Sequence, residues 1–256
     1  MSYSIQLYTL RDAISEDLPA TLRKVAEIGF THVEPYNFVA TAKELGAALK
    51  DNGLTSPSGH APLLSQDQDE IFTAAKELGI STVIDPYQPA DQWQNAETIQ
   101  ATAAKLNAAA KKGAEYGIRV GYHNHEWELE SIVDGRTALE YLAEHLDPAV
   151  ILEVDTYWVA VGGHDPVDIL TKLGDRVKFI HIKDGPINKD NKAQKAAGQG
   201  NVPVLEVIAA AQSLEVGVVE FDDYSGDIFD GIAQSLAFLN SNAASAGTGA
   251  TEGANA

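Results

Sequence analysis

The chain has 256 residues, 45% of them hydrophobic and 21% charged, which is typical of a globular protein with a large buried core. Its formal net charge of −19 argues against nucleic acid or an anionic membrane as a partner, because such partners need a basic surface. The absence of cysteine excludes disulfides, thiolate metal sites and cysteine nucleophiles.

The first residues enter a strand-like run at once, without the charged and apolar regions of a signal peptide. No apolar stretch is long enough to span a bilayer. We therefore expect a soluble, cytoplasmic protein that binds neither membrane nor nucleic acid. The sequence leaves homo-oligomerisation open.

Strand-like and helix-like segments alternate along the chain. The strands are rich in β-branched and apolar residues and are predicted at 4–9, 32–36, 54–60, 81–86, 119–125, 150–156, 177–184 and 217–222. The helices are amphipathic or alanine-rich and are predicted at 18–28, 41–51, 66–79, 92–116, 135–145, 166–173, 203–213 and 228–240. Glycine follows four of these helices, where a left-handed residue commonly ends a helix: Gly29, Gly53, Gly79 and Gly117.

Eight strands, each followed by a helix, predict a single-domain α/β protein, a (β/α)8 TIM barrel over residues 1–240. A doubly wound open sheet has the same alternation. The barrel is favoured because the first strand lacks a glycine-rich nucleotide loop and because polar residues end many strands instead of marking one switch point. Residues 185–202 predict a long polar loop over the barrel mouth. Residues 241–256 are almost all small or polar and predict a disordered C-terminal tail.

Acid, imidazole and amide groups occur where four of the predicted strands end. The four segments are Tyr122-His123-Asn124-His125, Glu153-Val154-Asp155, His181-Ile182-Lys183-Asp184 and Glu220-Phe221-Asp222. Alternate side chains of a strand point to the same face, so both histidines of the first segment share one face. In a barrel these faces would converge at the mouth. So many buried ionisable groups are costly unless they are paired or bind a metal ion.

Carboxylate and imidazole ligands without thiolate favour Mn, Zn, Co or Fe(II), and histidine makes Mg less suitable. Asp155, His181, Glu220 and one histidine of residues 123–125 can supply such a ligand set. Spacing does not choose between the two histidines, because both lie on the same side. A plainer interpretation remains for each residue: a lone strand histidine is more often part of the core, and a buried glutamate can pair with a lysine such as Lys183.

The ordered series of motifs resembles the sugar isomerase/epimerase superfamily with xylose-isomerase-like barrels, which includes ketose 3-epimerases, inosose dehydratases and endonuclease IV. The resemblance covers about residues 3–240. The segments that carry it are Gln6-Leu7-Tyr8-Thr9-Leu10-Arg11-Asp12, Tyr122-His123-Asn124-His125, Asp155-Thr156-Tyr157-Trp158, His181-Ile182-Lys183-Asp184, Gly198-Gln199-Gly200 and Val219-Glu220.

The resemblance implies a metal site whose ligands run Glu, Asp, His, Glu in chain order. The last three correspond to Asp155, His181 and Glu220. Relatives often read Glu-Asn-His at the end of strand five, where this chain has His123 and His125 around Asn124, so the first ligand is implied by position to be His123. Members that epimerise use two metal-bound glutamates as acid and base. Losing one of them shifts the chemistry here toward a histidine.

We predict three catalytic residues. His125 is the acid/base group, Glu220 is a ligand that can also act as base, and Lys183 polarises a carbonyl or steadies an enediolate oxygen. An ion pair is the equally weighted alternative for this lysine. The residues expected to contact substrate lie at other strand ends and are Glu34, His60, Tyr8 and Trp158. A strand-end hydrogen bond, or a place in the core for the aromatic residues, is their plainer role.

The resemblance implies a divalent-metal-dependent isomerase or epimerase of a free sugar, keto-sugar or cyclitol. A base would remove the proton next to a carbonyl, and the metal would stabilise the enediolate. The alternative is a lyase or dehydratase of a keto-sugar, keto-glycoside or inosose, in which the same first step is followed by β-elimination. A metal-dependent phosphodiesterase is disfavoured by the charge of −19. A sugar-binding barrel that has lost its metal is the non-catalytic alternative.

Overall fold

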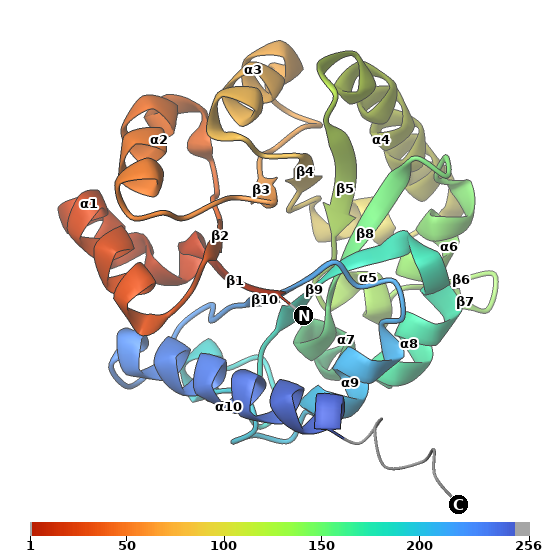
Figure 1. The fold of residues 1–256 in the computed structure, drawn as a ribbon. Helices are drawn as coiled ribbons and strands as arrows, with labels where there is room; N and C mark the ends of the chain where they lie inside the picture. Colours follow the sequence, from red (N-terminus) through yellow and green to blue (C-terminus); the bar gives the residue numbers. More distant parts are fainter. Residues whose placement is uncertain (1, 249–256) are drawn as a thin grey trace, which may run out of the picture.

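Eight parallel strands form the centre of the computed structural model, which describes residues 2–248 and the side chains of residues 2–242. The strands ring the middle of the molecule (Figure 1). They are β1 (Ser2–Gln6), β2 (His32–Glu34), β3 (Ser58–His60), β4 (Thr82–Asp85), β5 (Arg119–His123), β8 (Val150–Asp155), β9 (Val177–Ile182) and β10 (Val216–Val219).

The sheet closes into a barrel between its two ends. The strand order is β2-β1-β10-β9-β8-β5-β4-β3, with parallel pairing throughout. Parallel bridges between His32 and Thr55 and between Tyr36 and His60 join the segments of β2 and β3. The predicted (β/α)8 barrel is therefore confirmed, and the open-sheet alternative is excluded.

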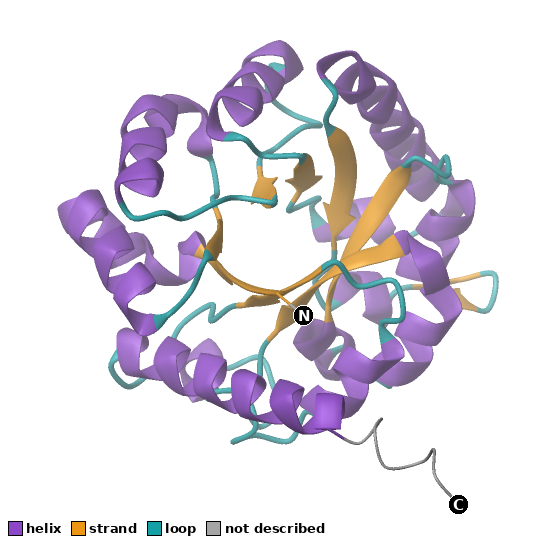
Figure 2. Cartoon of the chain, in the orientation of Figure 1, coloured by secondary structure: helices purple, strands orange, loops and turns teal. Residues whose placement is uncertain are grey.

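Helices surround the strand ring on all sides (Figure 2). Those that follow the barrel strands are α1 (Arg11–Ile28), α2 (Ala42–Asp51), α3 (Gln68–Leu78), α4 (Ala96–Tyr116), α6 (Ala138–His145), α8 (Pro166–Leu173), α9 (Val204–Ala210) and α10 (Ile228–Thr248). Each packs an apolar face on the sheet, as the predicted amphipathic pattern requires. None of the helices within the described residues has both the length and the apolar character needed to cross a membrane.

The structure differs from the predicted elements mainly at strand ends and in short insertions. The first strand stops at Gln6, because the side chain of Gln6 accepts a hydrogen bond from the Tyr8 backbone N–H and starts a 3-10 turn. The predicted helix 18–28 is the regular part of α1, which is interrupted at Asp17. Three short insertions were not predicted: α5 (Trp127–Glu130), the hairpin of β6 (Ile132–Val133) and β7 (Arg136–Thr137), and α7 (Thr156–Val161).

The C-terminal tail was predicted over residues 241–256. Helix α10 extends to Thr248 and so covers the first part of this range. Residues 249–256 lie outside the described residues, and for them the tail stays a prediction.

An apolar layer fills the barrel beneath its C-terminal end. It is a separate cluster of buried side chains: Ile84, Ile151, Phe179, Val216 and Val218. Three of its members lie two positions before a polar residue. Ile151 precedes Glu153 in β8, Phe179 precedes His181 in β9, and Val218 precedes Glu220, which directly follows β10. The alternation thus places the polar side chains directly above an apolar floor, at the end where TIM barrels carry their active sites.

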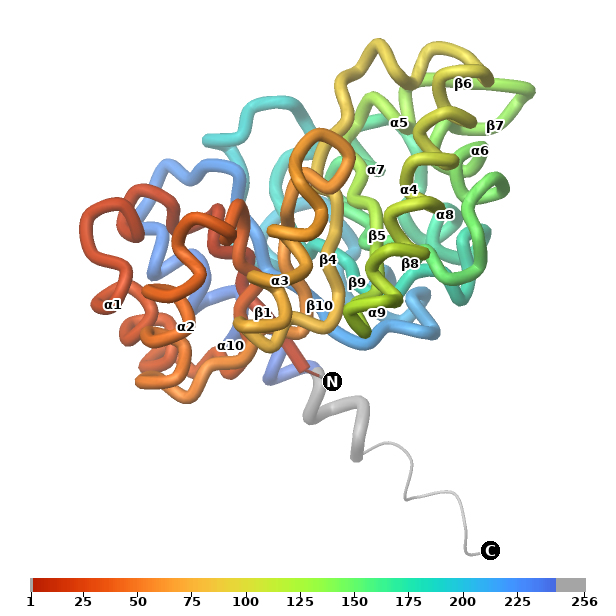
Figure 3. The backbone as a smooth tube through the Cα atoms, turned by 90° about the horizontal axis from the view of Figure 1, so that it is seen from above, coloured from red at the N-terminus to blue at the C-terminus, as the bar shows by residue number. Residues whose placement is uncertain are grey.

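The loop of residues 185–202 runs over the mouth and is anchored by one buried carboxylate. Asp184 accepts hydrogen bonds from the backbone N–H groups of Gly185, Gly198, Gly200 and Val202, at 2.8–3.0 Å. A methyl group on Gly200 would lie 2.1 Å from Asp184 Oδ1, so glycine lets the backbone approach the carboxylate this closely. In the side view the segment arches over the same end as α5 and α7 (Figure 3). The predicted loop is confirmed in its position.

Replacing the anchor should destabilise the protein. The change Asp184→Ala leaves four N–H groups without their acceptor, and we expect the free energy of unfolding to fall by about 2–3 kcal/mol. Urea denaturation measures this loss. The exposed Asp190→Ala in the same loop removes a single hydrogen bond, from the Lys192 N–H, and is the matched control, with an expected loss of about 1 kcal/mol or less. Equal values for the two variants would contradict the anchoring role.

Candidate active site

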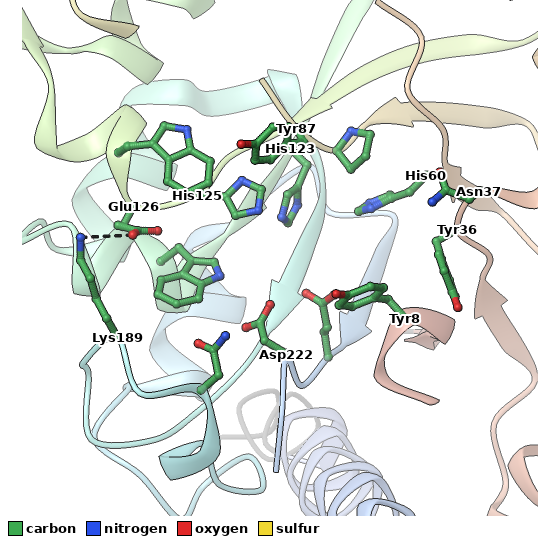
Figure 4. A pocket seen from close by; sticks show the side chains of 15 residues that line it. Tyr8, Tyr36, Asn37, His60, Tyr87, His123, His125, Glu126, Lys189 and Asp222 are labelled. Atoms are coloured by element: carbon green, nitrogen blue, oxygen red, sulfur yellow. Dashed lines mark ion pairs between the residues drawn. The ribbon is translucent and has the colours of Figure 1, made fainter. Parts of the chain in front are cut away.

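A cavity of about 530 Å³ opens at the C-terminal end of the barrel (Figure 4). Its wall contains three of the predicted substrate-contact residues, His60, Tyr8 and Trp158, together with both histidines of the strand-five segment. The complete lining is Tyr8, Tyr36, Asn37, His60, Pro86, Tyr87, His123, His125, Glu126, Trp127, Trp158, Lys189, Asn191, Glu220 and Asp222. This size and mixture of aromatic and polar groups are typical of a small-molecule site.

His181 lies at the centre of a buried polar cluster beside this cavity. Its two ring nitrogens face different carboxylates. Nδ1 lies 2.6 Å from Glu220 Oε2 and 3.9 Å from Asp155 Oδ2. Nε2 lies 2.9 Å from Glu34 Oε1 and 3.1 Å from Glu153 Oε2. The imidazole therefore separates two pairs of carboxylates. Glu220 and Asp155 lie on the cavity side, and Glu34 and Glu153 form a deeper pair, the deep layer.

Asp155 presents one free oxygen to the cluster. Its Oδ1 accepts the Trp158 N–H at 3.0 Å and caps α7, and its backbone N–H donates to Asn124 Oδ1 at 3.1 Å. Its Oδ2 is buried without an aligned hydrogen bond, although Lys183 Nζ lies 2.8 Å away as an ion pair. The fold thus fixes the carboxylate and leaves a lone pair aimed at the site.

Lys183 contacts three carboxylates at once. Its Nζ lies 2.8 Å from Asp155 Oδ2, 2.7 Å from Glu220 Oε2 and 2.8 Å from Asp222 Oδ2. The side chain of Gln194, from the loop over the mouth, also donates to Asp222 Oδ2 at 2.7 Å. The predicted ion pair of Lys183 is therefore present, and the ammonium is buried instead of lining the cavity.

Three imidazoles converge on Glu153. Its Oε2 lies 2.5 Å from His60 Nε2, 3.1 Å from His181 Nε2 and 3.2 Å from His123 Nδ1. The contact to His60 is an aligned hydrogen bond, whereas His123 Nδ1 has no aligned partner. The other nitrogen of His123 lies 3.9 Å from Asp155 Oδ2. His123, like His181, thus turns one nitrogen toward the deep layer and one toward Asp155.

Glu34 is fully buried beneath these imidazoles and does not line the cavity. Its Oε1 accepts from Gln6 Nε2 at 2.8 Å, and its Oε2 accepts a short hydrogen bond from Ser58. The residue was predicted to bind substrate. The structure brings it into the site, but as part of the deep layer.

The ionisation of the cluster reflects its buried charge. Burial raises the pKa of Glu34, and it raises the pKa of Asp155 to about 6 despite Lys183 and His181 nearby. Burial would raise the pKa of Glu220 too, but Lys183 and His181 outweigh it and hold that pKa well below its usual range. Burial would lower the pKa of His181, yet Glu153 and Glu220 raise it well above the usual value. The carboxylates thus outnumber the cations that compensate them.

Two overlapping groups of side chains could hold a metal ion. One contains His123, Asp155, His181 and Glu220, and the other contains His60, His123, Glu153 and His181. The first is the predicted ligand set. Nitrogen and oxygen donors without sulfur fit a divalent transition metal. The orphaned Asp155 Oδ2 and the neutral imidazole of His123, whose pKa burial lowers to about 3, offer lone pairs to such an ion. The residues therefore fit a metal centre.

His125 lies on the cavity wall, away from the deep layer. Its ring stacks on Trp127 at 4.4 Å and meets the edge of Tyr87 at 5.8 Å, and its Nδ1 is buried without a partner. Burial, followed by the nearby His123 and Lys183, holds the pKa of His125 well below its usual range. This imidazole is therefore neutral near pH 7 and able to accept a proton.

Several residues of the site were given no role from the sequence, although Gln6 and Asp222 lie in motifs named there. Gln6 and Ser58 support Glu34, Gln194 and Asp222 support Lys183, and Tyr87 and Trp127 enclose His125. The same strand parity that selected Glu220 also places Asp222 on its face, so that residue had a usable signal. Gln194 and Trp127 lie in segments whose course depends on tertiary contacts, and the sequence contains no signal for their position.

The chain belongs to the xylose isomerase-like TIM barrel family, whose model matches residues 22–242. This confirms the resemblance seen in the motifs. An inosose dehydratase of Geobacillus kaustophilus is 34% identical over 80 residues, 31% of this chain and 25% of that protein. A 2-epi-5-epi-valiolone 7-phosphate 2-epimerase of Actinoplanes sp. is 31% identical over 159 residues, 61% of this chain and 55% of that enzyme. The matches thus span only about a quarter to half of these relatives.

Solved structures share the fold over nearly the whole chain. A sugar phosphate isomerase/epimerase from Parabacteroides distasonis superposes with a TM-score of 0.77 and 24% identity, covering 93% of each chain. The IOLI protein with a bound zinc atom gives 0.71 and 14% identity, over 94% of this chain and 97% of that one. A Mycobacterium smegmatis protein in complex with magnesium gives 0.71 and 15%, over 93% and 95%. These structures establish the fold, and two of them contain a divalent metal.

The buried Glu128 should make the free energy of unfolding depend on pH. It accepts from the Tyr122 hydroxyl and, at 3.0 Å, from the His125 N–H, and burial raises its pKa to about 8. A carboxyl with a raised folded pKa adds stability that is complete below its unfolded pKa, near 4.5, and is lost as the pH rises through about 8.

We therefore expect Glu128→Gln to remove part of the pH dependence. Relative to the variant, the wild-type chain should lose on the order of 4 kcal/mol of unfolding free energy between pH 5 and pH 9. Urea denaturation in EDTA measures the difference. The exposed Glu115→Gln on α4 serves as control and should follow the wild type. A difference between wild type and Glu128→Gln that does not change with pH would refute the assignment.

Proposed function

We propose that this chain is a divalent-metal-dependent enzyme that isomerises or epimerises a free sugar, keto-sugar or cyclitol. The observation that carries the proposal is the convergence of Asp155, His181, Glu220 and His123 on one buried point beside the cavity. Membership of a barrel family with epimerase and dehydratase relatives supports it. The proposed metal is Mn, Zn, Co or Fe(II), because half of this donor set is imidazole.

The metal would be held by His123 through its Nε2 and by His181, Asp155 and Glu220. When bound, a divalent ion acts as a Lewis acid on a chelated carbonyl and hydroxyl and makes the neighbouring C–H more acidic. Asp155 is positioned for this role by α7 and Asn124, and Lys183 balances the carboxylates around it. The loop of residues 185–202 contributes Lys189 and Asn191 to the cavity wall, and excluding water there would strengthen these electrostatic contacts.

The base in this proposal is His125, with Glu220 as its alternative. Both line the cavity. The neutral imidazole of His125 takes the proton from the carbon next to the carbonyl. Returning that proton to the other carbon or to the opposite face completes isomerisation or epimerisation. Glu220 is already engaged by His181 and Lys183, which makes it the less available of the two.

The charges around the cavity support a substrate without phosphate. Lys189 is the one lysine or arginine among the described residues that line it, and its Nζ is paired with Glu126 at 3.2 Å and Glu130 at 2.8 Å. The dashed contact of Lys189 with Glu126 at the rim is drawn in Figure 4. A phosphate group would instead meet Glu220 and Asp222. Neutral hydroxyls can be bound by the same carboxylates without repulsion.

A dehydratase or lyase is the second candidate. A histidine occupies the position where an epimerase of this kind would need its second glutamate, and this favours chemistry with a single base. After the same proton abstraction, the oxygen on the β-carbon would leave with the bonding electrons and take up a proton. The product would be an unsaturated ketone and water or an alcohol.

Proton NMR in deuterium oxide, with a panel of keto-sugars and inososes and added Mn²⁺ or Zn²⁺, tests the shared first step; spectra are recorded after the metal is removed by chelation. We expect deuterium to enter at the carbon next to the carbonyl, because the base exchanges its proton with solvent. A rearranged sugar would identify an isomerase, and an unsaturated product would identify a lyase. No exchange with any member of the panel would contradict the proposal.

Two histidine variants separate metal binding from proton transfer. His181→Ala should lose both stoichiometric metal and deuterium exchange. His125→Gln should retain metal while its exchange rate falls by about 10²–10⁴-fold. The exposed His145→Ala on α6 is the control and should change neither quantity. Metal analysis by mass spectrometry accompanies the exchange assay, and full exchange by His125→Gln would move the role of base to Glu220.

A further inference from the structure

The deep carboxylate layer beneath the imidazoles has a role that the proposed reaction does not assign. Glu34 is completely buried, lies away from the cavity wall and engages both of its oxygens. A carboxylate in such a place costs free energy unless its contacts compensate for the lost hydration. Its other partners, besides Gln6 and Ser58, are two imidazoles: Nε2 of His181 at 2.9 Å and Nε2 of His60 at 3.2 Å from Glu34 Oε1.

The hydrogen-bond chain that ends at Glu34 has a defined direction. The backbone N–H of Tyr8 can only donate, and it donates to Gln6 Oε1 at 3.1 Å. The amide nitrogen of Gln6 must therefore be the atom that faces Glu34 Oε1, at 2.8 Å. Because the Ser58 hydroxyl donates to the other oxygen, Glu34 is held as an acceptor on both sides.

The contact of Glu34 with His181 is made to one ring nitrogen, Nε2. Nε2 lies 2.9 Å from Glu34 Oε1 and Nδ1 lies 2.6 Å from Glu220 Oε2, so each ring nitrogen faces a carboxylate. A cation bound on the Glu220 side would replace a proton on Nδ1, and Glu34 would hold the proton that remains on Nε2. The opposite nitrogen, Nδ1, then faces Glu220 and Asp155. Glu220 lines the cavity, so this is the side from which an ion and a substrate can enter. Carboxylates that fix a ligating histidine in this way usually matter for metal affinity.

We propose that Glu34, held by Gln6 and Ser58, is a positioning residue that presents Nδ1 of His181 to a divalent cation. The inference rests on the proposed metal site. It explains why an acidic residue of β2 is buried below the cavity, where it cannot reach the substrate. In this arrangement the ion does not rest in the deep group of His60, His123, Glu153 and His181, because the nitrogen of His181 that faces Glu153 is Nε2, which Glu34 holds.

Zinc binding to the full chain tests the proposal without relying on activity. In Glu34→Gln one of the two carboxylate oxygens becomes an amide nitrogen, so the side chain can no longer accept hydrogen bonds on both sides. We expect zinc affinity, measured by competition with a chromophoric chelator, to fall about 10–100-fold. Ser58→Ala keeps the carboxylate and removes one of its supports, so it should lower the affinity less, in the same direction. The exposed Glu77→Gln on α3 is the matched control and should bind like the wild type.

Nitrogen-15 NMR of histidine-labelled, zinc-loaded protein provides a readout that a purely structural role would not move. We expect His181 to carry its proton on Nε2 and to bind zinc through Nδ1. Binding through Nε2, or wild-type affinity in both the Glu34 and Ser58 variants, would overturn the inference while leaving the metal site intact. If the wild-type chain binds no zinc at all, the inference and the proposed function both fail.

Discussion

Buried negative charge at the barrel mouth is the constraint on which the rest of the site depends. Glu34, Glu153, Asp155, Glu220 and Asp222 lie within one cluster, and Lys183 and the imidazoles compensate them only in part. The two carboxyl groups whose pKa is raised, Glu34 and Asp155, are those for which burial outweighs the neighbouring cations. A divalent cation, which offers more charge in a smaller volume than an ammonium group, would stabilise such an arrangement.

The fold brings this charge together through the period of its strands. Each polar residue follows an apolar residue of the same face, so the apolar layer of Ile151, Phe179 and Val218 supports the polar layer above it. The register then places Asp155 beside His181 and His123 beside Glu153. Groups that are far apart in the chain become neighbours because every parallel strand ends at the same edge.

Much of this could be predicted from the sequence, because alternation and strand parity are local properties. The eight βα units, the loop over the mouth and the convergence of Asp155, His181 and Glu220 followed from residue patterns. The depth at which a residue lies in the barrel could not be predicted from these patterns. Glu34 on β2 and His60 on β3 both belong to the buried polar cluster, yet Glu34 lies beneath the imidazoles and His60 lines the cavity, since the stagger of the strands decides the layer. The environment of His125 was also inaccessible, because Trp127 reaches it from an unpredicted short helix.

His123 occupies the position where the resemblance to the family implies a glutamate ligand. Its neutral ring supplies a nitrogen where a glutamate would add another negative charge, and its other nitrogen turns toward Glu153. Under the proposed function, the site would keep a metal ligand at this position and would lack a second carboxylate base. In the proposed reaction, proton transfer would then depend on a residue of the cavity wall, and His125 lies there with a lowered pKa.

The central claim is that a divalent ion occupies the point between His181 Nδ1, Asp155 and Glu220. Anomalous X-ray scattering from crystals grown with Zn²⁺ tests it most directly. We predict one strong peak at about 2.0–2.2 Å from these ligand atoms and from His123 Nε2. A peak in the deep group around His60 and Glu153, or no peak among these side chains, would contradict the account.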